Sequence, residues 1–265
     1  MCESGRRAPR ALRALLAGAV LSALCSAALA QTPREIIAGA DKVRNPGQPF
    51  RATDTLNEYV AGKARGQDVL VVYSKEDPVT GQFRNLVRYV EPPRDEGKIA
   101  LLDGRALWFY DPASKTSVRI SPQQRLLGQA SIGEVLTVNL AVDYTGTLAG
   151  VEDIQDTARK ERRCWHLELK AANDQAAYDR VEYWVEQSSF YPVKMKFYSD
   201  SGRLLKILYY RGLEERLGRP RPVEAVIIDA VDTSLATTVK FGDLRFQDVP
   251  DAWFQREDLP RLKAE

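Results

Sequence analysis

Histidine and cysteine, the side chains most often used for nucleophilic attack, proton transfer near neutral pH and zinc binding, are scarce in this sequence. The 265-residue chain has one histidine, His166, and three cysteines, of which Cys2 and Cys25 lie near the N-terminus and Cys164 lies in the body of the chain. Cys164 and His166 are two positions apart, so on a β-strand they share a face and could form a thiolate–imidazole pair. The alternative is a polar strand face that both share with Glu168, without a third group to orient the imidazole. We favour this second interpretation and predict no catalytic residue.

Other catalytic chemistries fit the sequence no better. A structural zinc site needs about four ligands, and the body of the chain supplies one histidine and one cysteine. The glycines at 128–133 have the wrong spacing for a dinucleotide-binding loop, and neither a phosphate-binding loop nor a Gly-x-Ser-x-Gly elbow occurs. We therefore predict a non-enzyme without cofactor or metal. A hydrolase with two paired carboxylates stays open, because the sequence does not show which of its 36 acidic residues meet.

The first 30 residues have the layout of a secretory signal peptide. A basic start with four arginines is followed by an apolar stretch from 14 to 29. Ala28 and Ala30 place small side chains where the leader peptidase requires them. We therefore predict cleavage after Ala30, which leaves residues 31–265 as a single exported domain in the periplasm.

Two other export routes compete with plain cleavage. Cys25 could be lipidated, although the residue before it, Leu24, is larger than that signal prefers, and Arg6-Arg7 could belong to a twin-arginine signal. After removal of the leader, 34 basic and 35 acidic residues remain, a formal charge of −1. A near-neutral domain does not attract nucleic-acid phosphates or anionic headgroups through bulk charge, so neither is a predicted partner.

The elements that position any site are predicted from hydrophobic periodicity. Apolar residues at helical spacing, with a proline in the first turn, predict a helix over 33–44. Most of the chain after this helix alternates with the period of two that half-buried strands show. The predicted strands cover residues 50–59, 69–74, 83–90, 99–102, 107–110, 165–170, 180–186, 193–197, 204–210, 223–231 and 234–241. Only 123–140 interrupts them, with the spacing of a second helical segment. These patterns favour one α+β domain on a large, curved antiparallel sheet.

The stretch from Tyr183 to Lys206 resembles the LolA-like family of outer-membrane lipoprotein-sorting proteins. It contains a strand, a Pro-x-Lys-Met strand from Pro192 to Met195, and an Asp-Ser-Gly hairpin turn. Further stretches that fit the family lie at 35–37, 46–59, 91–95 and 249–254. The resemblance implies an incomplete (half-open) antiparallel β-barrel, with helices that cover its concave face and enclose an apolar cavity. It supplies no catalytic residue, and no cargo-contacting arginine is assigned from it.

The same resemblance implies transport of a lipid, or of the acyl chains of a lipoprotein, through the periplasm toward the outer membrane. An inner-membrane transporter would load such a carrier, and an outer-membrane acceptor would unload it. An acyl chain of about sixteen carbons costs on the order of 10 kcal/mol to expose to water, so its carrier must enclose it. We expect a monomer. The alternative is an interaction module of an envelope transport complex, with the same sheet fully packed inside.

Candidate cargo-binding residues follow from the expected lid and barrel wall. For the lid, the apolar residues of the second helical segment are the candidates: Leu126, Leu127, Ile132, Val135 and Leu136. For the wall, the candidates are Trp108 and Tyr110, on the aromatic strand at 107–110. Ordinary core packing is the competing interpretation of both sets.

Overall fold

The computed structural model describes residue 1, residues 31–104 and residues 106–262. The chain divides into two compact units, Met1–Gln31 and Thr32–Glu265, and the described helices and strands lie in the second. The predicted signal peptide and its cleavage after Ala30 lie outside the described residues. In the part of the chain that the structure describes, no helix is long and apolar enough to cross a bilayer.

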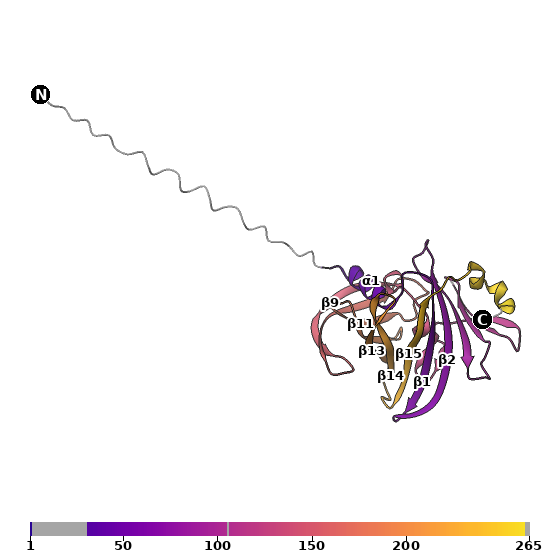
Figure 1. Cartoon of the computed structure of the whole chain (residues 1–265). Coiled ribbons are helices and arrows are strands. Elements are labelled where there is room, and N and C mark those ends of the chain that lie inside the picture. The colour runs from indigo at the N-terminus through magenta and orange to yellow at the C-terminus, as the bar shows by residue number, and fades with distance from the viewer. Residues whose placement is uncertain (2–30, 105, 263–265) are drawn as a thin grey trace. The chain divides into compact units, whose positions relative to one another are not determined.

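The opening helix α1 spans Pro33–Arg44, as the sequence predicts. It begins with a capping box, in which Thr32 Oγ1 accepts a hydrogen bond from the Glu35 amide (3.3 Å) and Glu35 Oε2 accepts one from the Thr32 amide (2.8 Å). Its inner face buries Ile36 and Ile37, and the helix packs against the sheet at β9, β11 and β12 (Figure 1).

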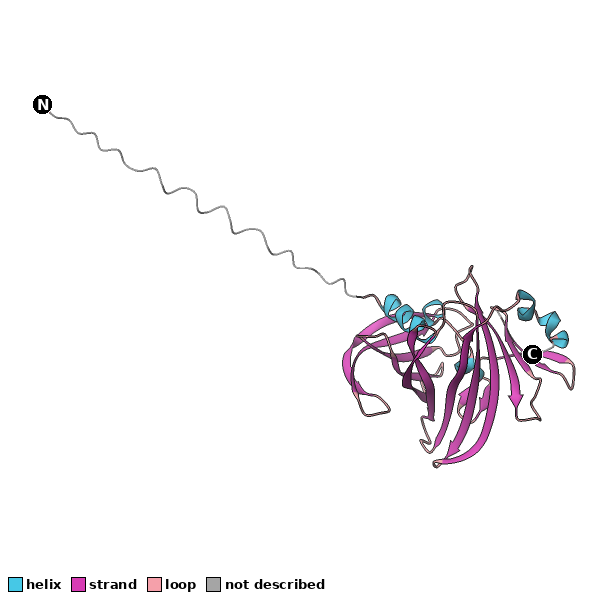
Figure 2. Ribbon diagram, viewed as in Figure 1, coloured by secondary structure: helices cyan, strands magenta, loops and turns pink. Residues whose placement is uncertain are grey.

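Most of the domain is one antiparallel sheet (Figure 2). The described residues form 13 strands in it, which are β1 (Phe50–Val60), β2 (Lys63–Glu76), β3 (Phe83–Glu91), β4 (Ile99–Leu102), β5 (Leu107–Asp111), β6 (Thr116–Ile120), β9 (Tyr144–Gln155), β10 (Glu161–Ala171), β11 (Arg180–Glu186), β12 (Pro192–Tyr198), β13 (Leu204–Arg216), β14 (Arg219–Asp229) and β15 (Leu235–Phe246). The order is β6-β5-β4-β3-β2-β1-β15-β14-β13-β12-β11-β10-β9, so each half is a meander and β1 joins the halves by pairing with β15. Because β6 and β9 stand at opposite ends of this order, the sheet does not close. The predicted incomplete barrel is confirmed.

The segment predicted as one helix over 123–140 is instead built from short pieces. A hairpin of β7 (Arg125–Leu127) and β8 (Ala130–Ser131) leads into the helices α2 (Ile132–Val135) and α3 (Leu140–Asp143). Gly128 turns the hairpin with a φ of +53°, and a Cβ there would lie 2.4 Å from Thr237 Oγ1. We call residues 123–143 the lid segment. The prediction of a single helix is wrong because this close approach to β15 favours a glycine turn over continued helix.

The described residues form two main cores on opposite faces of the sheet, and a small third cluster of Phe50, Ala52 and Phe83. The larger core fills the concave face beneath α1 and the lid segment. The smaller core lies on the outer face of β2–β5, where the C-terminal 3₁₀ helices η1 (Asp251–Phe254) and η2 (Arg256–Arg261) cover it. Trp253 meets Tyr73 edge to face there, with ring centroids 5.0 Å apart. One half of the sheet is therefore covered on both faces.

Candidate functional site: a cavity beneath the lid segment

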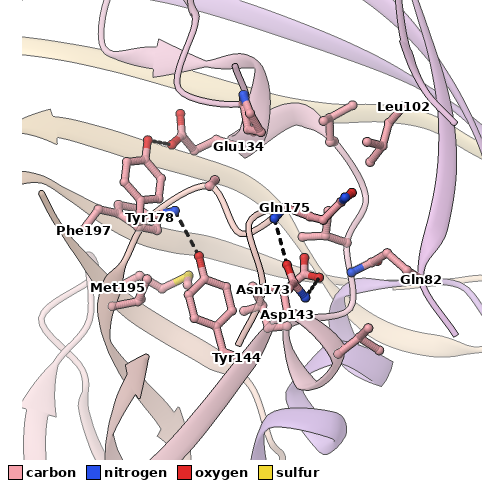
Figure 3. Close-up of a pocket in the computed structure, with 18 of the residues that line it drawn as sticks. Gln82, Leu102, Glu134, Asp143, Tyr144, Asn173, Gln175, Tyr178, Met195 and Phe197 are labelled. Atoms are coloured by element: carbon pink, nitrogen blue, oxygen red, sulfur yellow. Dashed lines mark hydrogen bonds between the residues drawn. The ribbon is translucent and has the colours of Figure 1, made fainter. Parts of the chain in front are cut away.

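A cavity of about 320 Å³ lies on the concave face between the sheet and the lid segment (Figure 3). Its walls come from β4, β11, β12 and β13, from the helices α2 and α3, and from the loop that precedes β11. This volume falls within the range of about 300–1,000 Å³ that small-molecule sites occupy. The cavity is therefore large enough to hold a ligand rather than a few waters alone.

Apolar and polar side chains both line the cavity (Figure 3). The apolar lining includes Val181, Met195, Phe197 and Leu208 from three consecutive strands. The polar lining includes the amides and carboxyls of Gln82, Asp143, Asn173, Asp174 and Gln175. Asn173 Nδ2 donates to Asp143 Oδ1 (3.3 Å), and burial raises the pKa of that carboxyl. This lining can contact apolar as well as polar parts of a ligand.

A second, smaller cavity of about 90 Å³ adjoins the first. The two share lining residues, including Arg44, Leu136 and Tyr210, which therefore form the partition between them. The far wall of the small cavity is formed by β1, β2 and β15 and contains Asp54.

Arg44 holds the partition in place from the last position of α1. Its Nη2 donates to Asp41 Oδ1 (2.7 Å) and to the carbonyl oxygen of Val138 in the lid segment (2.9 Å), and its Nη1 donates to the Tyr210 hydroxyl (3.5 Å). Asp41 is buried, and burial raises the pKa of its carboxyl. The guanidinium thus links α1, the lid segment and β13 at one point.

The first half of the lid segment is held by a buried ion pair. Lys206 on β13 places Nζ 3.1 Å from Glu134 Oε2 on α2 and donates to Ser131 Oγ (2.9 Å) and the Gln129 carbonyl (2.9 Å). The Tyr178 hydroxyl donates to the other Glu134 oxygen, and burial together with the adjacent carboxylate raises the pKa of that tyrosine. The side chains of Lys206 and Glu134 are 10% and 3% exposed, so water does not screen the pair.

The second half of the lid segment is extended at 137–139 and bonds to side-chain amides. Asn85 accepts from the Thr137 amide (3.0 Å) and donates to the Thr137 carbonyl (2.9 Å). Gln82 accepts from the Asn139 amide (2.7 Å) and donates to the Asn139 carbonyl (3.2 Å). These reciprocal pairs satisfy main-chain groups that would otherwise be buried without partners.

The predicted lid residues lie where the cavity and the core meet. Leu136 lines both cavities and Val135 lines the small one. Ile132 is buried in the core, whereas Leu126 and Leu127 are half-buried and pack against it. Leu136 and Val135 are therefore the predicted lid residues that a ligand would meet.

Trp108 and Tyr110, predicted as cavity wall, are not among the residues that line either cavity. They belong to the outer core, where the Arg256 guanidinium lies 4.1 Å from the centroid of a Trp108 ring and the indole N–H donates to Asp103 (3.2 Å). Leu107 faces the inner core instead. Side chains of neighbouring residues on a strand face opposite sides of the sheet, but this alternation does not show which side is concave. The wall is better assigned to Val181, Met195, Phe197 and Leu208.

Cys164 and His166 point to the same face of β10, where their partners on β11 are Glu186 and Trp184. The Cys164 thiol is fully buried, and burial raises its pKa to about 12, so little thiolate forms at neutral pH. His166 places Nδ1 2.9 Å from a Glu152 oxygen and stacks on Trp184, with ring centroids 4.3 Å apart. This geometry does not activate a nucleophile. Among the described residues, no three His, Cys, Asp or Glu side chains gather to hold a metal ion.

We expect Cys164 to resist thiol reagents in the folded protein. At pH 8 its labelling should be at least about a hundredfold slower than after unfolding in urea, because burial disfavours the thiolate and blocks access. A cysteine introduced into an exposed turn by Ser201→Cys is the control and should react at once. Rapid labelling of Cys164 would contradict the buried, protonated thiol and reopen the thiolate pair with His166.

Comparisons with known proteins place this fold. A solved LolA superfamily protein, NE2245 from Nitrosomonas europaea, is 30% identical, with a TM-score of 0.77 over 86% of this chain and 99% of that one. A DUF1329 family protein from Desulfovibrio piger is 19% identical, with a TM-score of 0.71 over 85% of this chain and 97% of that one. A domain described as an outer membrane lipoprotein-sorting protein, from Vibrio parahaemolyticus, is 18% identical, with a TM-score of 0.65 over 86% of this chain and 96% of that one.

Sequence comparison alone is less informative. No curated protein matches this chain. A family model with the description "Uncharacterized protein" matches residues 81–261. The match to the Nitrosomonas protein reaches 30% identity along nearly the whole of that chain, and both share the open antiparallel barrel. The chain therefore belongs to the LolA superfamily.

Proposed function

We propose that this protein is a periplasmic carrier that holds a lipid, or the acyl chains of a lipoprotein, in the cavity beneath the lid segment and moves it toward the outer membrane. The observation that carries the proposal is a cavity of about 320 Å³ with a largely apolar lining, on the concave face of an unclosed barrel. Each buried CH₂ contributes about 0.8 kcal/mol, so such a cavity favours an alkyl chain over water. The description of the Vibrio relative as a lipoprotein-sorting domain agrees with it.

The export, loading and unloading of the protein are part of the same proposal. Residues 1–30 act as a signal peptide, residues 31–265 form the carrier domain, a membrane transporter loads it as a monomer and an outer-membrane acceptor unloads it. The intact mass of protein isolated from the cell envelope tests the first step, because cleavage after Ala30 leaves a chain that starts at Gln31. A chain that retains the leader, or that carries lipid on Cys25, would contradict it.

The cargo is tested by native mass spectrometry of protein purified from envelope extract, followed by solvent extraction of what it holds. We expect a stoichiometric apolar adduct in the wild type. Leu208→Trp should remove the adduct, since Leu208 lines the cavity and the larger ring occupies the space of the cargo. Overpacking should cost no more than about 1–3 kcal/mol of stability, because the indole enters a void.

Leu213→Trp is the matched control, because Leu213 lies on the same strand with 43% of its surface exposed. It should keep the adduct. If neither the wild type nor the control holds an apolar molecule, and added lipids also fail to bind, the carrier is wrong and the interaction module gains support.

A further inference from the structure

Asp54 is a carboxyl group with no partner inside the apolar wall of the small cavity. It lies on β1 at a position that faces the concave side, 4% exposed, with Leu70 and Phe241 opposite it on the neighbouring strands. Its Oδ1 is fully buried and has no hydrogen-bond partner among the described residues. A buried polar group without a partner costs about 1–3 kcal/mol, so a packing role does not explain an aspartate here.

Three arginines, Arg44, Arg216 and Arg221, line the same cavity, and their hydrogen bonds go to groups other than Asp54; those of Arg216 go to Glu214 and the Phe241 carbonyl. Arg44 donates hydrogen bonds from Nη1 and Nη2 to Asp41, Val138 and Tyr210. Arg221, also 4% exposed, donates to the main-chain carbonyls of Val43 (3.1 Å) and Arg216 (3.2 Å). Burial is the cause that raises the pKa of Asp54 to about 7, with no cation lowering it. Arg44 Nε is likewise buried without a hydrogen-bond partner among the described residues, so the uncommitted groups of the residues that line this cavity are one guanidinium N–H and a carboxyl group that is mostly neutral below a pH of about 7.

We infer that Asp54 binds the polar end of the cargo and that this end is an uncharged group that both donates and accepts hydrogen bonds, a hydroxyl or an amide. This inference rests on the proposed carrier function. The alkyl chain occupies the large cavity, and the polar end passes the partition of Arg44, Leu136 and Tyr210 to reach Asp54.

An uncharged end group is favoured over a charged one by the cost of burial. A neutral carboxyl offers one O–H donor and one carbonyl acceptor, which a hydroxyl or an amide matches with one acceptor and one donor. A carboxylate or an ammonium would have to leave water for the surroundings of Asp54, where Val72 and Phe241 line the cavity, and an ion pays far more for that transfer than a neutral group does. The surroundings of Asp54 therefore disfavour a charged end group.

The test compares five sixteen-carbon probes by their displacement of the dye phenylnaphthylamine from the mature protein: hexadecanol, hexadecanamide, hexadecane, palmitate and hexadecylamine. We expect hexadecanol and hexadecanamide to bind the wild type about tenfold more tightly than hexadecane, because each satisfies the orphan carboxyl. Asp54→Leu should remove this preference and leave hexadecane binding at least as tight. Asp200→Asn, in an exposed turn outside both cavities, is the control and should keep the preference.

The outcomes separate the two proposals. If no probe displaces the dye from any variant, the carrier function fails, and this inference fails with it. If the probes bind but the alcohol and amide gain nothing over hexadecane, if palmitate or hexadecylamine binds best, or if the preference survives Asp54→Leu, the inference alone is overturned. Should Asp54→Leu fail to fold, the infrared carbonyl band of the protonated Asp54 decides, because it should shift on hexadecanol binding in the wild type and be absent from Asp54→Asn.

Discussion

Asp54→Asn is expected to stabilise the folded protein at neutral and alkaline pH. Burial raises the pKa of the Asp54 carboxyl from 3.8 to about 7, so between these values the folded state holds a proton that the unfolded state has released. The free energy of unfolding contributed by this site therefore falls as pH rises from about 4 to 7 and stays low above that. The raised pKa corresponds to a loss of about 4 kcal/mol in the free energy of unfolding of the wild type above pH 7. The variant with a neutral asparagine does not suffer this loss.

The measurement is urea unfolding of both proteins between pH 4 and 8. The gain of Asp54→Asn over the wild type should be absent at pH 4, grow through pH 7 and then level off, while effects of other titrating groups cancel in the difference. Asp200→Asn, in an exposed turn, is the control and should change stability by less than about 0.5 kcal/mol at any pH. A constant difference between Asp54→Asn and the wild type would show that the carboxyl titrates normally, and would refute the buried neutral acid.

Lys206→Met is expected to destabilise the protein by about 3–5 kcal/mol. The change removes the ammonium from a pair whose carboxylate, on Glu134, is 3% exposed and cannot regain water. Removal of one partner of a buried pair leaves an uncompensated charge, which is the source of a loss of this size. Because the pair joins α2 to β13, we also expect faster amide exchange in the hairpin β7–β8 and in α2 than in α1.

Two further variants keep this prediction specific. Lys196→Met removes one of several partners of Glu182, at a site where the lysine side chain is 27% exposed, and should cost less than about 1 kcal/mol. The double variant Lys206→Met with Glu134→Gln should be more stable than Lys206→Met alone, because the buried, unpaired Glu134 carboxylate is then replaced by a neutral amide. If Lys206→Met costs no more than Lys196→Met, the buried pair does not hold the lid segment.

Much of this fold could be predicted from local sequence patterns, and the rest depends on distant contacts. The helix at Pro33–Arg44 starts and stops on its own signals, and alternation gives most strands. The strands β6 and β9 escape prediction because edge strands bury little of either face, so their side chains do not alternate clearly. The outer core could not be predicted for another reason. The sequence around Trp108 does not indicate that the distant helices η1 and η2 cover this face.

The candidate site shows the same division. Val181, Met195 and Phe197 sit on the apolar face of strands that the sequence predicts, so they could have been proposed as cavity wall. Asp54 could also have been noticed in the sequence, because it is the one polar residue in the inward-facing series Phe50, Ala52, Asp54, Leu56. No sequence pattern predicts the pairing of Lys206 with Glu134, because these are two common residue types separated by 72 positions.

The pairing of β1 with β15 has a consequence for how the domain folds. Each meander on either side forms from strands that follow one another, whereas this central pair brings together Leu56 and Val239 from near the two ends of the domain. Loops of that length close slowly compared with hairpins. The concave wall that carries Asp54 needs both β1 and β15, so we expect a chain that emerges from synthesis to complete its small cavity only after the last strand is available.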